Sequence, residues 1–264
     1  MEHRVTAVLV AAGSSTRMGF DKLSFDLGGE TVLERSVRAF DECPEVDELV
    51  IVTGASGENA QRAAARCKKP VRLVKGGSTR AESARSGVAA AHGRLVAVHD
   101  AARPFVSQSV IADTIAAAAR CGAAAPAVPV KDTIKRARDS LVEATLERSE
   151  LFAVQTPQVF QVDLIKAALV KALEDGAALT DDCGAVERLG IGVSLTQGDY
   201  CNLKITTPED LAVAVETLMH AVQLPVKLSQ HGITAADLPQ IAAETLQEKI
   251  ALLGPKPVDS KLIC

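Results

Sequence analysis

The stretch VLVAAGSSTRMGFDKLSF, residues 8–25, is the part of the sequence that indicates the fold most directly. It opens with a run of small and β-branched apolar residues, which predicts a buried strand. The strand leads into a loop of small residues around Gly13, where a backbone without a side chain can turn and come close to a ligand. Arg17 and Lys22 then follow. The loop has neither the G-x-G-x-x-G nor the G-x-x-x-x-G-K-[ST] pattern of phosphate-binding loops.

The residues of this loop leave two interpretations open. Successive backbone N–H groups after a strand can form a concavity that binds anions. Arg17 would add a planar fork for phosphate oxygens and Lys22 a mobile charge, so that the loop would suit a triphosphate. The alternative is a surface loop with two solvated cations.

Outward from this loop, apolar runs alternate with alanine-rich segments of helical periodicity. The expected strands cover residues 6–12, 46–54, 71–77, a run that begins at 95, and 123–130. The expected helices cover residues 31–43, 58–67, 79–91 and 108–122, the last ending at Gly122. Such alternation predicts an α/β fold with a doubly wound, mostly parallel sheet. In these sheets the ligand crevice lies at the carboxyl ends of the strands, so residues 11–22, 76–83 and 99–104 are the most informative.

The alternation breaks at about residue 131. Residues 131–160 are rich in charge and have short alternating stretches, which favour an extended β-arm or a lobe outside the main sheet. Helical periodicity returns over 163–177, and residues 193–222 are interpreted as strand, loop, strand and helix, with Thr207 as the N-cap. We expect one domain over residues 1–222 and a helical appendage over 223–264.

Composition excludes some functions. The formal net charge of −4 gives no global attraction for nucleic acid or anionic membrane, so an anionic substrate would need local cations. The sequence has no stretch of about eighteen apolar residues, so it predicts no membrane span. The short apolar run near the N-terminus is interpreted as the first strand. The six cysteines form no C-x-x-C pair. We therefore expect a cytoplasmic protein whose cysteines are small buried hydrophobic residues.

Polar residues follow other expected strands. Asp100 ends a hydrophobic run in VAVHDAARPF, a position suited to Mg²⁺, which binds one or two carboxylates together with substrate phosphates. The alternative for Asp100 is a helix N-cap, and His99 is expected to pack rather than to bind a ligand. Lys204 lies between two apolar residues and is expected to face a cleft or solvent. The glycines of VKGGSTRAESARSG, residues 74–87, could serve a ligand or an ordinary turn equally well.

These motifs, in this order, resemble the 2-C-methyl-D-erythritol 4-phosphate cytidylyltransferase family of the non-mevalonate isoprenoid pathway. The resemblance covers about residues 5–220 and rests on AAGSSTRMG with DKL, GGSTRAES, VHDAARPF, VKDTIKR, QTPQVF, TDDCGAVE and NLKITTPEDL. It implies a Rossmann-like nucleotidyltransferase fold with a protruding β-arm that completes a homodimer. It also implies that the arm supplies residues to the partner's site.

The resemblance implies that the phosphate of methylerythritol phosphate attacks the α-phosphorus of CTP and that pyrophosphate leaves, with Mg²⁺ as cofactor. The residues implied as catalytic are Arg17, Lys22, Arg148 and Lys204. Those implied for the nucleotide are Ala11, Ala12, Gly13, Ser15, Gly77, Ser83 and Asp100, of which Asp100 also holds the metal. Those implied for the sugar phosphate are Arg103, Thr133, Arg148 and Lys204.

Some positions depart from the family pattern, and other functions stay open. Cys201 stands where some members carry an acidic residue, which leaves Asp199 as the candidate for a second metal carboxylate. The span between Met18 and Lys22 is short, so the reach of Lys22 to the phosphates depends on the path of the loop. The alternative functions are a ribitol-5-phosphate cytidylyltransferase and a non-catalytic nucleotide-binding scaffold.

Overall fold

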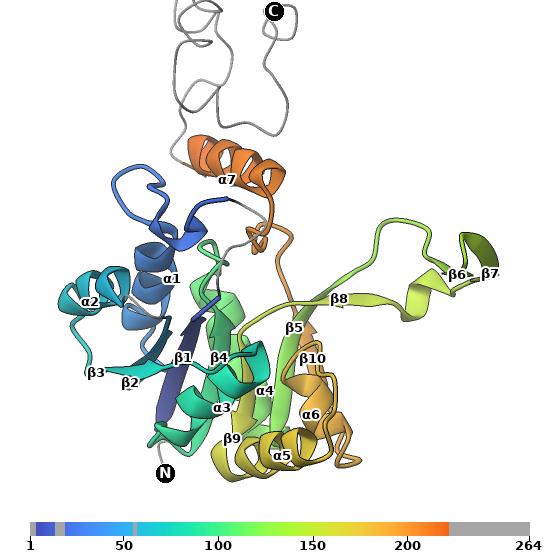
Figure 1. Ribbon diagram of the computed structural model, residues 1–264, viewed down its shortest axis with the longest axis horizontal. Helices are drawn as coiled ribbons and strands as arrows, with labels where there is room; N and C mark the ends of the chain where they lie inside the picture. Colours follow the sequence, from blue (N-terminus) through green and yellow to red (C-terminus); the bar gives the residue numbers. More distant parts are fainter. Residues whose placement is uncertain (1–3, 14–18, 55–56, 222–264) are drawn as a thin grey trace, which may run out of the picture. The chain divides into compact units, whose positions relative to one another are not determined.

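The computed structural model describes residues 4–13, 19–54 and 57–221 (Figure 1). The chain divides into two compact units, residues 1–204 and residues 205–264. Two residues expected in the nucleotide site, Ser15 and Arg17, lie outside the described residues, as does the expected appendage 223–264. The expected domain boundary at residue 222 stays a prediction.

The first unit is built on one sheet with the strand order β10-β5-β9-β4-β1-β2-β3. Its strands are β1 Val5–Ala11, β2 Glu48–Thr53, β3 Val71–Lys75, β4 Leu95–Asp100, β5 Ala123–Pro129, β9 Gln158–Gln161 and β10 Ser194–Gln197, and the short β8 Phe152–Val154 pairs with β5. The pairs β1–β2, β1–β4, β2–β3 and β5–β10 are parallel. β9 lies antiparallel between β4 and β5. The mostly parallel sheet is confirmed, and the antiparallel strands β9, between β4 and β5, and β8, paired with β5, are additions to it.

Helices cover both faces of the sheet, as expected for a doubly wound fold. They are α1 Val32–Asp41, α2 Glu58–Ala65, α3 Arg80–Ala89, α4 Gln108–Cys121, α5 Val162–Glu174 and α6 Cys183–Glu187. On one face α3, α5 and α6 pack over buried β-branched and alanine side chains of the sheet. α1 contacts both α2 and α4, and these three also contact the strands.

The close seating of α3 on the sheet depends on Gly87. A Cβ at Gly87 would lie 2.3 Å from a methyl group of Val8 in β1 and 2.7 Å from one of Val52 in β2. A side chain there would therefore push α3 away from the strands. The first turn of α3 is fixed by a capping box between Thr79 and Glu82. Together these features place the N-terminus of α3, and with it Arg80, beside the carboxyl end of β4.

A two-stranded ribbon extends from the sheet (Figure 1). It consists of β6 Lys135–Arg138 and β7 Leu141–Thr145, which pair with each other and not with the main sheet. Asp139 and Ser140 form its turn with φ of 48° and 65°, the left-handed backbone that tight hairpins require. The expected β-arm thus exists as a ribbon, and the later part of the 131–160 segment returns to the main sheet. It returns because Val159 and Phe160 in β9 are fully buried there.

The segment after β10 differs in part from expectation. The expected second strand around residues 202–206 is irregular backbone. In the second unit, α7 Pro208–Ala221 begins as predicted: Thr207 accepts a hydrogen bond from the N–H of Asp210, and Asp210 accepts one from the N–H of Thr207. Among the described residues, no helix has the length and apolar character needed to cross a membrane. The cytoplasmic location stays a prediction.

Candidate functional site

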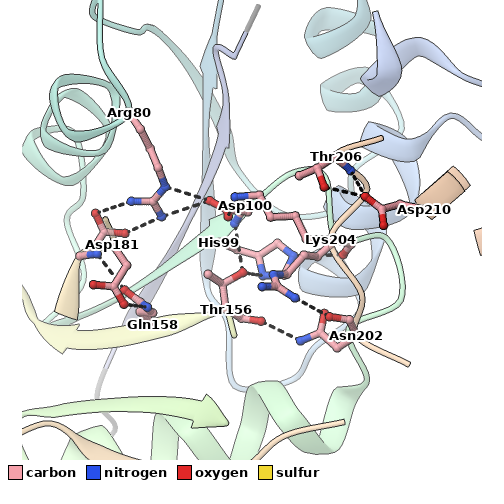
Figure 2. A network of polar contacts seen from close by, with 12 residues as sticks. Arg80, His99, Asp100, Thr156, Gln158, Asp181, Asn202, Lys204, Thr206 and Asp210 are labelled. Atoms are coloured by element: carbon pink, nitrogen blue, oxygen red, sulfur yellow. Dashed lines mark hydrogen bonds and ion pairs between the residues drawn. The ribbon is translucent and has the colours of Figure 1, made fainter. Parts of the chain in front are cut away.

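The site centres on Asp100, the last residue of β4. Its carboxylate is divided between two cations: Oδ1 accepts a hydrogen bond from Nε of Arg80 at 3.1 Å, and Oδ2 lies 2.6 Å from Nζ of Lys204. Figure 2 shows Arg80 and Lys204 on opposite sides of this carboxylate. Asp100 is only 8% exposed, and burial acts to raise its pKa, but the two cations hold the pKa well below its usual range. The group is therefore a buried anion with both oxygens occupied.

Arg80 is the first residue of α3 and connects Asp100 to a second carboxylate. Its Nη1 and Nη2 donate to the two oxygens of Asp182 at 3.0 and 2.9 Å, a bidentate pair. The side chain of Asp182 is 1% exposed, and burial raises the pKa of this carboxyl. Its backbone N–H is held by Oε1 of Gln158 in β9 at 2.9 Å. Neither Arg80 nor Asp182 was among the residues predicted for the site, although they lie within the motifs GGSTRAES and TDDCGAVE.

The substitution Asp182→Ala should destabilise the fold, because it leaves the guanidinium of Arg80 without its bidentate partner in a buried place. We expect the free energy of unfolding to fall by about 3 kcal/mol, the lower end for breaking a buried ion pair, since Arg80 keeps Asp100. Urea unfolding followed by circular dichroism measures the change. The control is Asp113→Ala on an exposed position of α4, which should change stability by less than about 0.5 kcal/mol. Equal losses in both variants would contradict the structural role of the pair.

Buried side chains that are hydrogen-bonded to one another hold the backbone of Asp100 in place. Oγ1 of Thr156 accepts the backbone N–H of Asp100 at 3.2 Å and lies 3.0 Å from Nδ1 of His99. Nε2 of His99 lies 3.1 Å from the carbonyl oxygen of Arg103. Burial lowers the pKa of His99 to about 4, so this side chain is neutral at neutral pH. His99 is thus a packing residue, as expected, and it fixes the turn that carries Arg103.

The loop that carries Lys204 is attached to the same residues. Nδ2 of Asn202 donates to the carbonyl oxygen of Thr156 at 2.9 Å, and the carbonyl oxygen of Asn202 accepts from Nη1 of Arg103 at 2.5 Å. The structure therefore brings together three of the expected residues: Asp100, Arg103 and Lys204. Nε of Arg103 is buried and has no hydrogen-bond partner among the described residues. Asn202 and Thr156, which hold these residues in place, were not predicted individually.

The small-residue loop after β1 borders a cavity of about 450 Å³. Ala11, Ala12 and Gly13 line it, together with Asp21 and Leu23 among others. Lys22 lies between the last two, as the first residue of the short helix η1 Lys22–Ser24. Asp21, directly before Lys22, therefore lines the same cavity as Gly13.

The loop between β3 and α3 approaches the opening loop closely. A Cβ at Gly76 would lie 2.4 Å from the Cβ of Ala12, so a glycine is needed for this approach. The backbone N–H of Gly77 donates to Oγ of Ser83 at 3.2 Å, and Ser83 donates in turn to the carbonyl oxygen of Thr79 at 2.9 Å. Gly77 and Ser83 are thus in contact with each other, beside the loop of Ala12.

The two expected residues on the arm lie elsewhere in the chain. Thr133 and Arg148 are both exposed, and Nη1 of Arg148 donates to the carbonyl oxygen of Lys131 at 3.0 Å. No hydrogen bond or ion pair among the described residues joins either of them to Asp100.

The carboxylates limit what metal the site could hold. Within the part of the chain that the structure describes, no three His, Cys, Asp or Glu side chains come together as a metal site. Asp199, the candidate second carboxylate, accepts the backbone N–H of Cys201 at 2.8 Å and so caps its own loop. Of the two carboxylates expected for the metal, Asp100 remains, with Arg80 and Lys204 on its oxygens in this structure. This set fits Mg²⁺, which commonly uses one carboxylate together with substrate phosphates.

The chain is similar to known proteins over most of its length. The family model described as IspD, 2-C-methyl-D-erythritol 4-phosphate cytidylyltransferase, matches residues 5–220. A 2-C-methyl-D-erythritol 4-phosphate cytidylyltransferase of Caldanaerobacter subterraneus subsp. tengcongensis is 45% identical over 221 residues, which are 80% of this chain and 96% of the relative. A bifunctional enzyme IspD/IspF of Anaeromyxobacter sp. is 44% identical over 87% of this chain, which spans only 61% of that relative. The crystal structure of 4-diphosphocytidyl-2C-methyl-D-erythritol synthase from Anaerococcus prevotii superposes with a TM-score of 0.76 at 32% identity, covering 83% of this chain and 97% of the other.

Proposed function

The chain belongs to the 2-C-methyl-D-erythritol 4-phosphate cytidylyltransferase family, and from this premise we propose that it transfers the cytidylyl group of CTP to 2-C-methyl-D-erythritol 4-phosphate. The observation that carries the proposal is the pairing of Lys204 and Arg80 around the ionised Asp100, next to the loop of Ala12. This set of charges lies at the carboxyl edge of a doubly wound sheet, where such folds bind nucleotides.

The reaction is a displacement at phosphorus. An oxygen of the sugar phosphate attacks the α-phosphorus of CTP, the bond from that phosphorus to the bridging oxygen of the β-phosphate breaks, and pyrophosphate leaves with the electron pair. Such a reaction depends on positioning and on neutralising charge in the transition state, and it needs no covalent intermediate with the protein.

The cations of the chain take this charge. Arg17 and Lys22 bind the triphosphate and stabilise the charge that develops on it. Lys204 and Arg148 position the attacking phosphate. The backbone of the opening loop lines the nucleotide, through Ala11, Ala12, Gly13 and Ser15. Gly77 and Ser83 select the cytosine, and Arg103 and Thr133 complete the contacts to the sugar phosphate.

Asp100 would hold the Mg²⁺ of the CTP complex. When bound, the ion neutralises phosphate charge during the displacement. The low pKa of Asp100 keeps its carboxylate ionised and ready for a cation. Lys204, whose side chain is 38% exposed, can leave Asp100 for the phosphate of the acceptor without crossing the core.

The arm would complete the site of a second chain in a homodimer. Two observations support this: Thr133 and Arg148 are exposed and make no hydrogen bond or ion pair with Asp100, and the arm side chains Leu141 and Val142 are 74% and 62% exposed. Sedimentation of the full chain tests the pairing, and a monomer at assay concentrations would contradict it.

A pyrophosphate-release assay tests the function. We expect release with CTP and 2-C-methyl-D-erythritol 4-phosphate, and little with UTP, ATP or GTP. Ribitol 5-phosphate as the acceptor is the decisive comparison, because both acceptors are linear polyol phosphates. Release with ribitol 5-phosphate alone would overturn the proposed acceptor. No release with any pair would favour a non-catalytic scaffold.

A further inference from the structure

Tyr200 joins the loop that carries Lys204 to the root of the arm. It lies three residues after β10 and is half-exposed. Its hydroxyl donates to the carbonyl oxygen of Pro129, the last residue of β5, at 2.8 Å. Nζ of Lys131 lies 3.6 Å from the centre of its ring, in the geometry of a cation–π contact. The polar end and the face of one side chain therefore both hold the first residues of the arm.

The loop around Tyr200 is in turn fixed to the site. Asp199, the residue before Tyr200, is bound by the side-chain amide of Gln155. Nε2 of Gln155 donates to the carbonyl oxygen of Asp199 at 2.7 Å, and Oε1 of Gln155 accepts the backbone N–H of Asp199 at 3.2 Å. Two residues after Tyr200, Asn202 is bound both to Thr156 and to Arg103. A displacement of Tyr200 would therefore be felt at Lys204 through a short, well-bonded stretch of backbone.

The other side of the contact leads to Arg148. Its Nη1 donates to the carbonyl oxygen of Lys131 at 3.0 Å. Lys131 thus connects Tyr200 to the arm residue that the proposed function assigns to the acceptor phosphate. The root of the arm is held at Pro129 and at Lys131, while most of residues 131–150 are exposed.

We propose that Tyr200 is a positioning residue that clamps the root of the arm onto the Lys204 loop. The clamp rests on the proposed function for its effect on the reaction, because it acts through Lys204 and Arg148 and does not touch the substrate. It sets the angle at which the arm leaves the sheet, and so the place that Thr133 and Arg148 reach. Without it, the acceptor phosphate would meet cations whose positions are poorly fixed.

Steady-state kinetics test the clamp. Tyr200→Ala removes a hydrogen bond and a cation–π contact, and we expect the KM for the sugar phosphate to rise about tenfold with little change in the KM for CTP. Tyr200→Phe keeps the ring and loses only the hydrogen bond, so its KM for the sugar phosphate should rise only a few-fold. The matched control is Leu195→Ala, which removes a comparably exposed apolar side chain from the preceding strand β10. An unchanged KM for the sugar phosphate in Tyr200→Ala, or equal rises for both substrates, would overturn the proposal.

A second measurement needs no activity. Trypsin cleaves after the exposed basic residues of the arm, so the rate of cleavage within residues 131–148 reports how firmly the root is held. We expect faster cleavage in Tyr200→Ala than in the wild type and in Leu195→Ala, with thermal unfolding of all three alike. Equal cleavage rates would overturn the clamp. If the wild type releases no pyrophosphate with any substrate pair, the proposed function fails, and the cleavage rates still decide whether the clamp exists.

Tyrosine fluorescence reports on the contact itself. Tyr200 is the only tyrosine, and the chain has no tryptophan. Its emission therefore carries no signal from another residue of these types. We expect Lys131→Met, which removes the ammonium group over the ring, to change the intensity of this emission in the absence of substrate. An emission identical to that of the wild type would mean that the contact does not form in solution.

Discussion

Replacing Asp100 with asparagine is expected to lower the rate of pyrophosphate release by about a hundredfold or more, the range for losing one electrostatic contact in a transition state. Asparagine keeps the shape of the side chain but carries no charge. It can neither hold Mg²⁺ by a carboxylate nor anchor Lys204 and Arg80 at their observed distances of 2.6 and 3.1 Å. The measurement is the rate at saturating CTP and sugar phosphate, over a series of Mg²⁺ concentrations.

The fold should survive this change, because Arg80 keeps its bidentate partner Asp182. Equal far-ultraviolet circular dichroism and unfolding of the variant and the wild type would establish that. Asp113→Asn on the exposed side of α4 is the matched control and should keep the full rate. A variant Asp100→Asn with near-normal turnover and a normal dependence on Mg²⁺ would remove Asp100 from the proposed mechanism.

The doubly wound fold could be predicted because its signals are local. The buried strands β1, β2 and β4 are continuous apolar runs, and capping residues such as Thr79 mark where the helices between them begin. The antiparallel β9 could not be predicted in the same way. It is four residues long, and its direction depends on how the chain returns from the arm, which no short pattern encodes. The same holds for residues 202–206, where Leu203 and Ile205 on either side of Lys204 suggested a strand but side-chain hydrogen bonds replace a sheet ladder.

The candidate site was predictable where a residue follows a strand. Asp100 at the end of β4 is such a case. It lies near Ala12 because β4 pairs in parallel with β1, and Ala12 directly follows β1. Arg80 shows the limit: in the sequence it is a charge in a glycine-rich loop, and its partner Asp182 is 102 residues away. Only the TDDCGAVE motif hinted that this region matters. Lys204 was expected to face a cleft or solvent; its side chain is 38% exposed, and its bond to Asp100 is the part that the sequence pattern could not indicate.

The arm shows a different limit. Its charge and alternation predict a segment outside the main sheet, and β6 and β7 confirm that. Thr133 and Arg148 are both exposed on that segment, and we propose that they act in the site of a second chain. Their roles stay proposals that depend on the pairing of two chains.

Lys22→Ala is expected to lower turnover by about two to three orders of magnitude, because it removes a cation that we propose stabilises the charge developing on the triphosphate. The backbone on either side of this lysine is held in place. Asp21 caps η1 by accepting the N–H of Leu23 at 3.1 Å, and Leu23 is buried. Both neighbours line the cavity that Ala11, Ala12 and Gly13 border. The expected signature is a large fall in kcat at saturating CTP, measured by pyrophosphate release.

Two comparisons separate this role from a general loss of positive charge. Lys22→Arg keeps the charge but exchanges a compact ammonium group for a larger planar one, and it should recover only part of the rate. Lys68→Ala removes an exposed lysine whose backbone N–H, not its ammonium group, is bound to Asp41, and it should leave the rate unchanged. Arg17→Ala should resemble Lys22→Ala, since both cations serve the same triphosphate. If Lys22→Ala keeps near-normal turnover while Arg17→Ala loses it, the triphosphate charge is carried by Arg17 and the opening loop, and Lys22 has no catalytic role.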